Sequence, residues 1–492
     1  IARQFGARVY SIPWENDFAK ARNAALRKAT QPWILYLDAD ERLYPEYHSA
    51  VKQALASDDA DAYYVKILSH LNGKLGNVPH TQNYPRIFKN LPGVQFEGKI
   101  HEQITPSLSR LGARFKNLDI TIEHLGYNLP PEDIEAKIKR NLKFLEEQVA
   151  AEPDNWYALF QLGQTYIVDD QIDKGLTILH RLLQFDNITV TIAASALALI
   201  GNQLFLRKDY LSAREYIHKS IEIAPNQRLG YFLLSEIEAA LENWDAAIRA
   251  LEKYLENEEL AFSDLGVDKV LDHKLVVFRL ARNWIQLGRY ENAAEIFQAH
   301  LLQRGYFDTE ILEKFLQILA HIPETAIVEQ YIQTLFGQIP NDVNSELYYR
   351  LIATFCQEKG LLSLETQVLS LAVQHFPQSA LFWYALGNAR AKSNEFTEAI
   401  QAYEKAITLS PTLYEAYYNA AVLAMKNGNF PTAMNWFERI SQQFPQYREE
   451  ANRRIAALLI KSGQLEAALQ RLGVPAAKTQ EVLKMHGNVP NM

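Results

Sequence analysis

The stretch Trp33-Ile34-Leu35-Tyr36-Leu37-Asp38-Ala39-Asp40-Glu41 decides the first part of the fold. Its apolar beginning is typical of a buried strand, and two carboxylates, Asp38 and Asp40, follow where that strand would run into a loop. Carboxylates spaced i, i+2 in such a turn can meet one hard divalent cation, and the cation can hold a diphosphate. Asp-rich turns are also common as solvated or helix-capping segments, so the neighbouring sequence decides between these interpretations.

Upstream of the strand, residues 14–26 have the pattern of a helix, and Gln31-Pro32 separates that helix from the strand. One face of the helix carries its apolar residues, namely Phe18, Ala21, Ala25 and Leu26. Open α/β sheets bind ligands at the carboxyl ends of their strands. The acidic pair therefore lies where a nucleotide site is expected.

The run Asp17-Phe18-Ala19-Lys20-Ala21-Arg22-Asn23, the apolar strand and the Asp-x-Asp motif together resemble family-two glycosyltransferases, which have the GT-A fold. The resemblance covers residues 1–128 and is closest to a bacterial branch in which this domain is fused to helical repeats. The chain starts without Met, and we expect a helix end at residues 1–5 and a strand at residues 8–12. Two earlier strands of the family would precede them, so we expect a fragment lacking on the order of 50 residues.

The resemblance implies roles for single residues. Asp38 would touch the ribose of the donor, and Asp40 would ligate Mg²⁺ or Mn²⁺. Arg22 matches the family arginine that approaches the donor diphosphate, where a guanidinium supplies a charge-assisted hydrogen bond. Glu41 would add a water-mediated contact or cap the next segment.

Two later motifs resemble the same branch. In Gly98-Lys99-Ile100-His101-Glu102, the family keeps a carboxylate that serves as the general base of an inverting transfer. Glu102 is the expected base, and His101 is the alternative base or orients the acceptor. A structural interpretation instead places Glu102 in an ion pair of the Arg86–Glu102 type beside a core histidine. His124 matches a His-x-Gly-Tyr motif and would be a third metal ligand, a diphosphate contact or a structural histidine.

From about residue 153, similar residues recur every 34 positions, which is the tetratricopeptide period. Small residues stand where two helices of a unit cross, bulky residues stand between units, and proline ends the second helix. The clearest unit contains Trp383, Leu386, Gly387, Ala399, Tyr403, Ala406 and Pro411, and its successor contains Tyr417, Ala420, Ala421, Ala433, Phe437, Ile440 and Pro445. We predict about nine helical pairs of this kind.

The predicted organisation has three parts. A glycosyltransferase domain lacking its first strands covers residues 1–128, a bracing linker helix lies within residues 129–152, and the repeats cover residues 153–490. The fold class is α/β, a partial GT-A nucleotide-sugar-binding domain, followed by an all-α superhelix. Such a superhelix has a concave groove for extended peptides or helices. Asn202, Asn388 and Asn419 lie near groove-facing positions, either to bond a peptide backbone or as solvated polar residues.

Composition limits the function further. Residues 1–128 hold 16 Lys and Arg against 13 Asp and Glu, a net charge of +3, which suits a diphosphate. The remainder has a net charge of −11, so the whole chain has a net charge of −8. The acidic remainder argues against a nucleic acid partner. The single cysteine, Cys356, excludes an intrachain disulfide and a cysteine-based metal cluster. No apolar stretch reaches transmembrane length and no signal peptide is visible, so we expect a cytoplasmic protein.

The parent protein is therefore predicted to be a metal-dependent inverting glycosyltransferase that moves a sugar from a nucleotide-diphosphate donor. Its acceptor would be a protein or peptide held by the repeats, or a glycan, and the repeat groove would also bind protein partners. The alternative is a non-catalytic protein-binding scaffold with a remnant transferase domain. Sugar, nucleotide, acceptor and oligomeric state are left open.

Overall fold

The computed structural model describes residues 2–15, 17–73, 76–100, 102–125, 131–257 and 273–487. The chain forms two compact units, Ile1–Arg289 and Tyr290–Met492. The first unit contains the sheet and the first helical repeats, and the second contains helices. No helix in the described ranges combines the length and the apolar character that crossing a bilayer requires.

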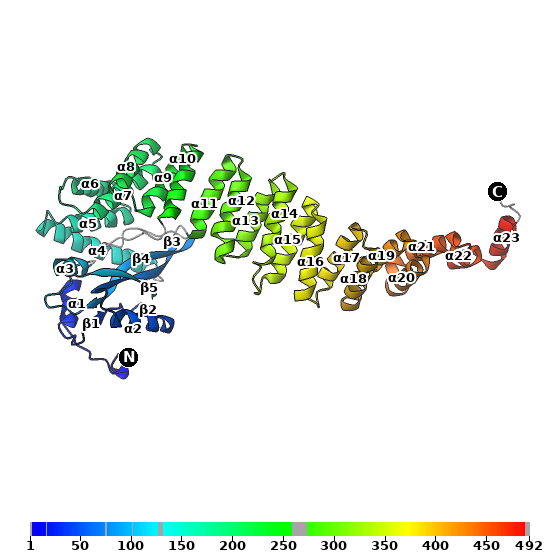
Figure 1. Cartoon of the computed structure of the whole chain (residues 1–492), viewed down its shortest axis with the longest axis horizontal. Helices are drawn as coiled ribbons and strands as arrows, with labels where there is room; N and C mark the ends of the chain where they lie inside the picture. The colour runs from blue at the N-terminus through cyan, green and yellow to red at the C-terminus, as the bar shows by residue number, and fades with distance from the viewer. Residues whose placement is uncertain are drawn as a thin grey trace. The chain divides into compact units, whose positions relative to one another are not determined.

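Strands β3, β4 and β5 form the middle of the sheet and lie side by side (Figure 1). Within the described residues the strand order is β1-β4-β3-β5-β2, with β3 and β5 parallel and the other neighbours antiparallel. The strands are β1 (Trp33–Leu35), β2 (Glu41–Leu43), β3 (Ala62–Gly73), β4 (Gly76–Lys89) and β5 (Phe115–His124). Because β1 and β2 occupy opposite edges, the five residues between them cross the middle strands. This crossing carries the acidic pair.

Both faces of the sheet are covered, because successive side chains of a strand point to opposite faces. One face packs Tyr63, Val65 and Ile67 of β3 against α2 (His48–Ala56). The other face packs Ala62 and Phe88 against α1 (Phe18–Leu26) and α3 (Thr105–Arg110). Two short 3₁₀ helices, η1 (Ala2–Phe5) and η2 (Pro45–Tyr47), complete this region.

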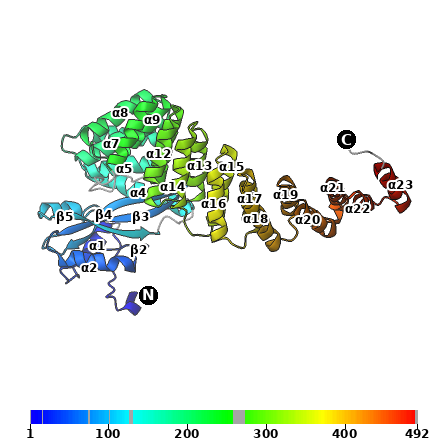
Figure 2. The same ribbon diagram turned by 45° about the vertical axis from the view of Figure 1, so that its right-hand side comes forward.

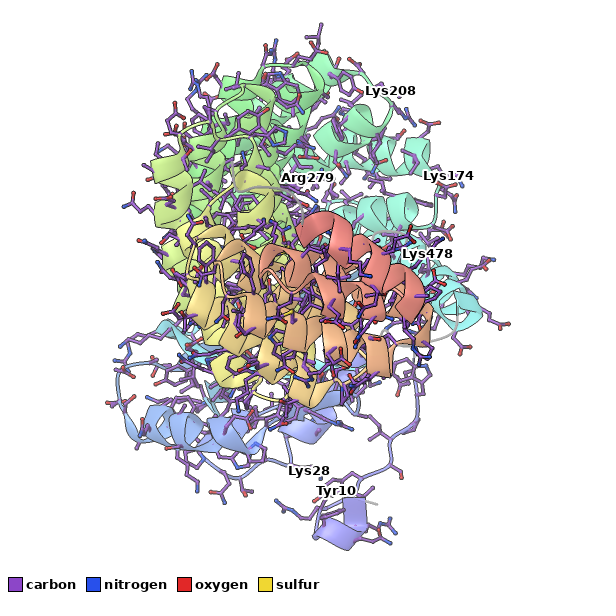
Figure 3. All side chains as sticks on the ribbon, turned by 90° about the vertical axis from the view of Figure 1, so that its right-hand side faces the viewer. Tyr10, Lys28, Lys174, Lys208, Arg279 and Lys478 are labelled. Atoms are coloured by element: carbon purple, nitrogen blue, oxygen red, sulfur yellow. The ribbon has the colours of Figure 1, made fainter. Side chains whose placement is uncertain are left out.

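The expected strand at residues 8–12 is absent from the structure, which shows irregular backbone there. Val9, Tyr10 and Ile12 are exposed, and no described strand pairs with them. An extended segment becomes a strand through hydrogen bonds to a neighbouring chain, which the alternating sequence alone does not provide. In Figure 3 the labelled Tyr10 and Lys28 lie near one another, with the ammonium group 5.4 Å from the ring centroid.

Helix α4 (Pro131–Ala151) occupies the position of the expected linker helix. Glu132 and Asp133 in its first turn favour a helix start there. Its stripe of Leu142, Leu145 and Val149 is buried against α5. The helices that follow in the first unit are α5 (Trp156–Val168), α6 (Ile172–Leu182), α7 (Val190–Leu206), α8 (Tyr210–Ile223), α9 (Arg228–Ala240), α10 (Trp244–Glu256) and α11 (His273–Gln286).

The second unit continues the helical repeats (Figure 2). Gly387 shows why the repeat needs a small residue, since a Cβ there would lie 2.5 Å from Cε1 of Tyr403. Asn388 Oδ1 accepts hydrogen bonds from Tyr403 and Asn419, each 2.9 Å long. The elements are α12 (Tyr290–His300), η3 (Leu302–Arg304), α13 (Thr309–Ala320), α14 (Thr325–Phe336), α15 (Ser345–Lys359), α16 (Leu362–His375), α17 (Ala380–Lys392), α18 (Phe396–Leu409), α19 (Tyr414–Lys426), α20 (Phe430–Gln443), η4 (Pro445–Tyr447), α21 (Arg448–Lys461), α22 (Leu465–Arg471) and α23 (Ala476–Gly487).

Candidate functional site

The acidic turn between β1 and β2 is held by its own backbone and by β5. The N–H of Glu41 donates to the carbonyl oxygen of Asp38 at 3.1 Å, which closes the turn. The N–H of Leu125, directly after β5, donates to the carbonyl oxygen of Asp40 at 2.8 Å. The side chain of Glu41 reaches back and accepts from the N–H of Asp38 at 2.9 Å. The two aspartates are therefore presented from a fixed backbone.

Glu41 is also one half of a buried ion pair with Arg86 of β4. The side chains of Glu41 and Arg86 are 2% and 8% exposed, so each buried charge depends on the other for its compensation. The Arg86 guanidinium stacks over the ring of Tyr36 at 4.4 Å and lies 3.7 Å from Oδ2 of Asp38. Sequence reasoning missed this role of Arg86, although an arginine beside the apolar Ile87 and Phe88 is a signal for a buried partner.

Arg22 of α1 bridges two carboxylates. Its Nη2 donates to Oδ1 of Asp38 at 2.6 Å, and its Nε donates to Oε1 of Glu102. Burial disfavours the charged guanidinium, but Glu102 and Asp38 outweigh this and hold the pKa of Arg22 above its ordinary value. Burial also disfavours the charged form of Tyr36, which for a phenol means that its pKa is raised, against the opposing effect of Arg86 and Arg22. The ring of this neutral phenol thus lies 5.0 Å from the Arg22 guanidinium and 4.4 Å from that of Arg86.

Helix α1 is positioned by the residues next to Arg22 in the motif. Asp17 caps the helix by accepting from the N–H of Lys20 at 2.8 Å. Asn23 exchanges two hydrogen bonds with the backbone of Phe96, at 2.8 and 2.7 Å. The Asp-Phe-Ala-x-Ala-Arg-Asn run therefore contains one residue that faces the acidic turn and two that hold the helix in place.

Glu102 lies in the site with a side chain that is 10% exposed. The structural interpretation of the sequence placed Glu102 in an ion pair of the Arg86–Glu102 type. In the structure Glu102 is paired with Arg22, and Arg86 is paired with Glu41. His101, the other candidate, lies outside the described residues.

Asp40 and His124 form the second part of the site. Nε2 of His124 lies 3.2 Å from Oδ2 of Asp40, and the side chains are 16% and 45% exposed. In the part of the chain that the structure describes, no three His, Cys, Asp or Glu side chains gather as a metal site. The Asp40 carboxylate is nevertheless a ligand type that Mg²⁺ or Mn²⁺ prefers, and in a nucleotide site phosphate oxygens complete the coordination.

Comparison with known proteins finds two kinds of region in the chain. Residues 1–115 match the model of Glycosyl transferase family 2, and residues 232–306 and 387–428 match tetratricopeptide repeat models. The chain is thus a fusion of a family 2 glycosyltransferase region with tetratricopeptide repeats.

Two curated relatives match parts of this chain. The prophage-derived glycosyltransferase SunS of Bacillus subtilis (strain 168) is 27% identical over 212 residues, covering 42% of this chain and 48% of SunS. A TPR repeat-containing protein of Synechococcus elongatus is 32% identical over 169 residues, covering 33% of this chain and 41% of the relative. The chain therefore spans less than half the length of these two relatives. Among solved structures, the crystal structure of MamA matches with 20% identity and a TM-score of 0.28, over 37% of this chain and 99% of MamA.

Proposed function

We propose that the protein is a metal-dependent inverting glycosyltransferase that uses a nucleotide-diphosphate sugar as donor. The observation that carries the proposal is the unequal environment of the two aspartates on one rigid turn. Asp38 accepts a hydrogen bond from Arg22, whereas Asp40 lies beside His124. Such an arrangement separates a group that orients the donor from a group that can ligate a metal ion.

Four residues would hold the donor. Asp38 would bind the ribose, and Asp40 with His124 would hold Mg²⁺ or Mn²⁺, which when bound neutralises charge on the departing diphosphate. Arg22 places a guanidinium group beside the same turn, where it would attract the diphosphate and hold it in position. The net positive charge of residues 1–128 acts in the same direction.

Glu102 would be the general base. In the transfer, the acceptor nucleophile forms a bond to the anomeric carbon while the carbon–oxygen bond to the diphosphate breaks and its electron pair leaves with the diphosphate. The carboxylate of Glu102 takes the proton of the acceptor, and a single displacement inverts the anomeric configuration. Because Oε1 of Glu102 accepts from Arg22, the other carboxylate oxygen, Oε2, would take the proton of the acceptor.

The acceptor that we propose is a protein or peptide side chain presented by the repeats, with a glycan as the other class. In the second unit, a pocket of about 520 Å³ is lined by residues of α15, α16, α17 and α18, among them Arg350, Phe382, Asn388 and Tyr403. A groove of this type, with polar groups on an apolar floor, suits an extended peptide. If the transferase region does not bind nucleotides, this groove supports the alternative function of a protein-binding scaffold.

Calorimetric titration of uridine diphosphate with Mn²⁺ tests the donor site in wild type and in Asp40→Ala. We expect Asp40→Ala to weaken metal-dependent binding at least about tenfold, since loss of even an outer-sphere partner of a metal costs 10- to 100-fold. Asp119→Ala is the matched control, because that carboxylate is 92% exposed on the same sheet. Equal binding by Asp40→Ala and wild type would contradict the metal role. Absence of binding for every common nucleoside diphosphate would contradict the enzyme.

A further inference from the structure

The first repeat helix touches the loop that carries Glu102. Tyr157, in the first turn of α5, accepts a hydrogen bond from Nε2 of Gln103 at 3.1 Å. Gln161, one turn later on the same helix face, also bonds the Tyr157 hydroxyl. Burial raises the pKa of Tyr157 above its ordinary value, and the nearby Tyr84 and Glu102 add to the shift. The phenol is therefore neutral at any working pH and lies within electrostatic reach of Glu102.

Gln103 closes the loop that contains Glu102. Glu97 and Gln103 exchange both backbone hydrogen bonds, at 2.9 and 2.8 Å, and Gly98 turns the chain with a φ of +95°. Glycine adopts this conformation without the strain that a Cβ would add. The backbone pair fixes the base of the loop, and the hydrogen bond that Gln103 donates to Tyr157 fixes the Gln103 side chain. Because Gln103 directly follows Glu102, a displaced Gln103 also displaces the carboxylate.

We propose that Tyr157 is a positioning residue, through which the first repeat helix holds Glu102 in register with Arg22 and Asp38. The repeats then complete the active site in addition to presenting an acceptor. This inference rests on the proposed function, because it gives the loop a role in sugar transfer. A purely structural contact between α5 and the loop would stabilise the fold without altering turnover.

Tyr157→Phe removes the hydroxyl and keeps the ring. Tyr166→Phe is a matched control, since Tyr166 lies on the same helix and donates to Oε1 of Glu146 on α4 at 2.6 Å. Each variant of the full chain is assayed with Mn²⁺ for hydrolysis of UDP-glucose, UDP-galactose, UDP-N-acetylglucosamine and GDP-mannose, measured as nucleoside diphosphate released. Binding of uridine diphosphate is measured by calorimetry, and exchange of the Gln103 amide by mass spectrometry.

We expect Tyr157→Phe to lower kcat about tenfold or more, because small misplacements of a catalytic group cost up to 10²-fold. The dissociation constant for uridine diphosphate should be unchanged, and the backbone amide of Gln103 should exchange its hydrogen faster. Tyr166→Phe should behave as wild type in all three measurements. Gln103→Leu should reproduce the loss of turnover, and the double variant should lose no more, since the two residues act as one unit.

The outcomes separate the inference from the proposed function. A wild-type chain that hydrolyses a donor and is matched by Tyr157→Phe contradicts the inference alone. Equal losses in Tyr157→Phe and Tyr166→Phe also contradict it, because they indicate general destabilisation. A wild-type chain that binds no nucleoside diphosphate and hydrolyses none of these donors contradicts the proposed function and the role of Tyr157 together.

Discussion

Removing Glu41 should destabilise the sheet more than removing any exposed carboxylate of the same region. The side chains of Glu41 and Arg86 are 2% and 8% exposed, so Glu41→Ala leaves a buried guanidinium without its main counter-charge. Breaking a buried pair in this way costs about 3–5 kcal/mol. Asp38 at 3.7 Å offers only partial compensation, and Nε of Arg86 already has no hydrogen-bond partner among the described residues. The loss also frees the N–H of Asp38, which loosens the acidic turn.

Native-state hydrogen exchange of the β4 amides measures this loss directly, because exchange reports local opening free energies. A cost of about 3–5 kcal/mol corresponds to opening that is more frequent by a factor of roughly 10² to several thousand. Glu97→Ala is the control, since Glu97 and Arg110 form a pair whose side chains are 32% and 59% exposed. That pair should contribute less than about 1 kcal/mol.

A double variant distinguishes the ion pair from packing. Glu41→Leu with Arg86→Met replaces both charges by apolar groups, and such replacements are often neutral or stabilising. We expect it to exchange more slowly than Glu41→Ala. If Glu41→Ala changes the opening free energy by less than about 1 kcal/mol, the pair is not the buried, mutually dependent unit described above.

Two further predictions concern the second unit. Gly387→Ala should lower its stability to urea by about 1–3 kcal/mol, the usual cost of overpacking, because the new methyl group meets Tyr403. Gly337→Ala, where a Cβ meets nothing within 4 Å, should have little effect, and equal losses would refute the packing argument. Burial, with the charge of Glu365, raises the pKa of Cys356 to about 12. The native thiol should therefore stay protonated and unreactive toward a disulfide reagent at pH 8 and react after unfolding, whereas rapid native labelling would contradict its burial.

The repeats were predictable because their signal is local and recurs. A small residue at Gly387 and an aromatic residue at Tyr403 reflect one helix crossing, and the same crossing returns after each period. Each of these features depends on residues that are close in sequence.

The prediction of a strand at residues 8–12 was wrong for the opposite reason, because a strand depends on residues that are distant in the sequence. Its alternating sequence is compatible with a strand, but strand formation depends on a partner segment, and no described segment pairs with it. The sheet order was likewise beyond the sequence, since β1 and β2 are neighbours in the chain and occupy opposite edges. Alternation specifies faces of a strand and does not specify its neighbours.

The sequence by itself determined which residue types gather near the acidic turn, because the Arg-Asn helix, the strand and the Asp-x-Asp motif form one contiguous pattern. The tertiary structure alone decided how these charges pair. Arg22 pairs with Glu102, which is 80 positions away, and Arg86 pairs with Glu41. Tyr157 in the first repeat accepts a hydrogen bond from Gln103. Several carboxylates and arginines were chemically equivalent candidates in the sequence. The choice among them follows from the sheet order and from the docking of α5, which bring specific pairs within hydrogen-bond distance.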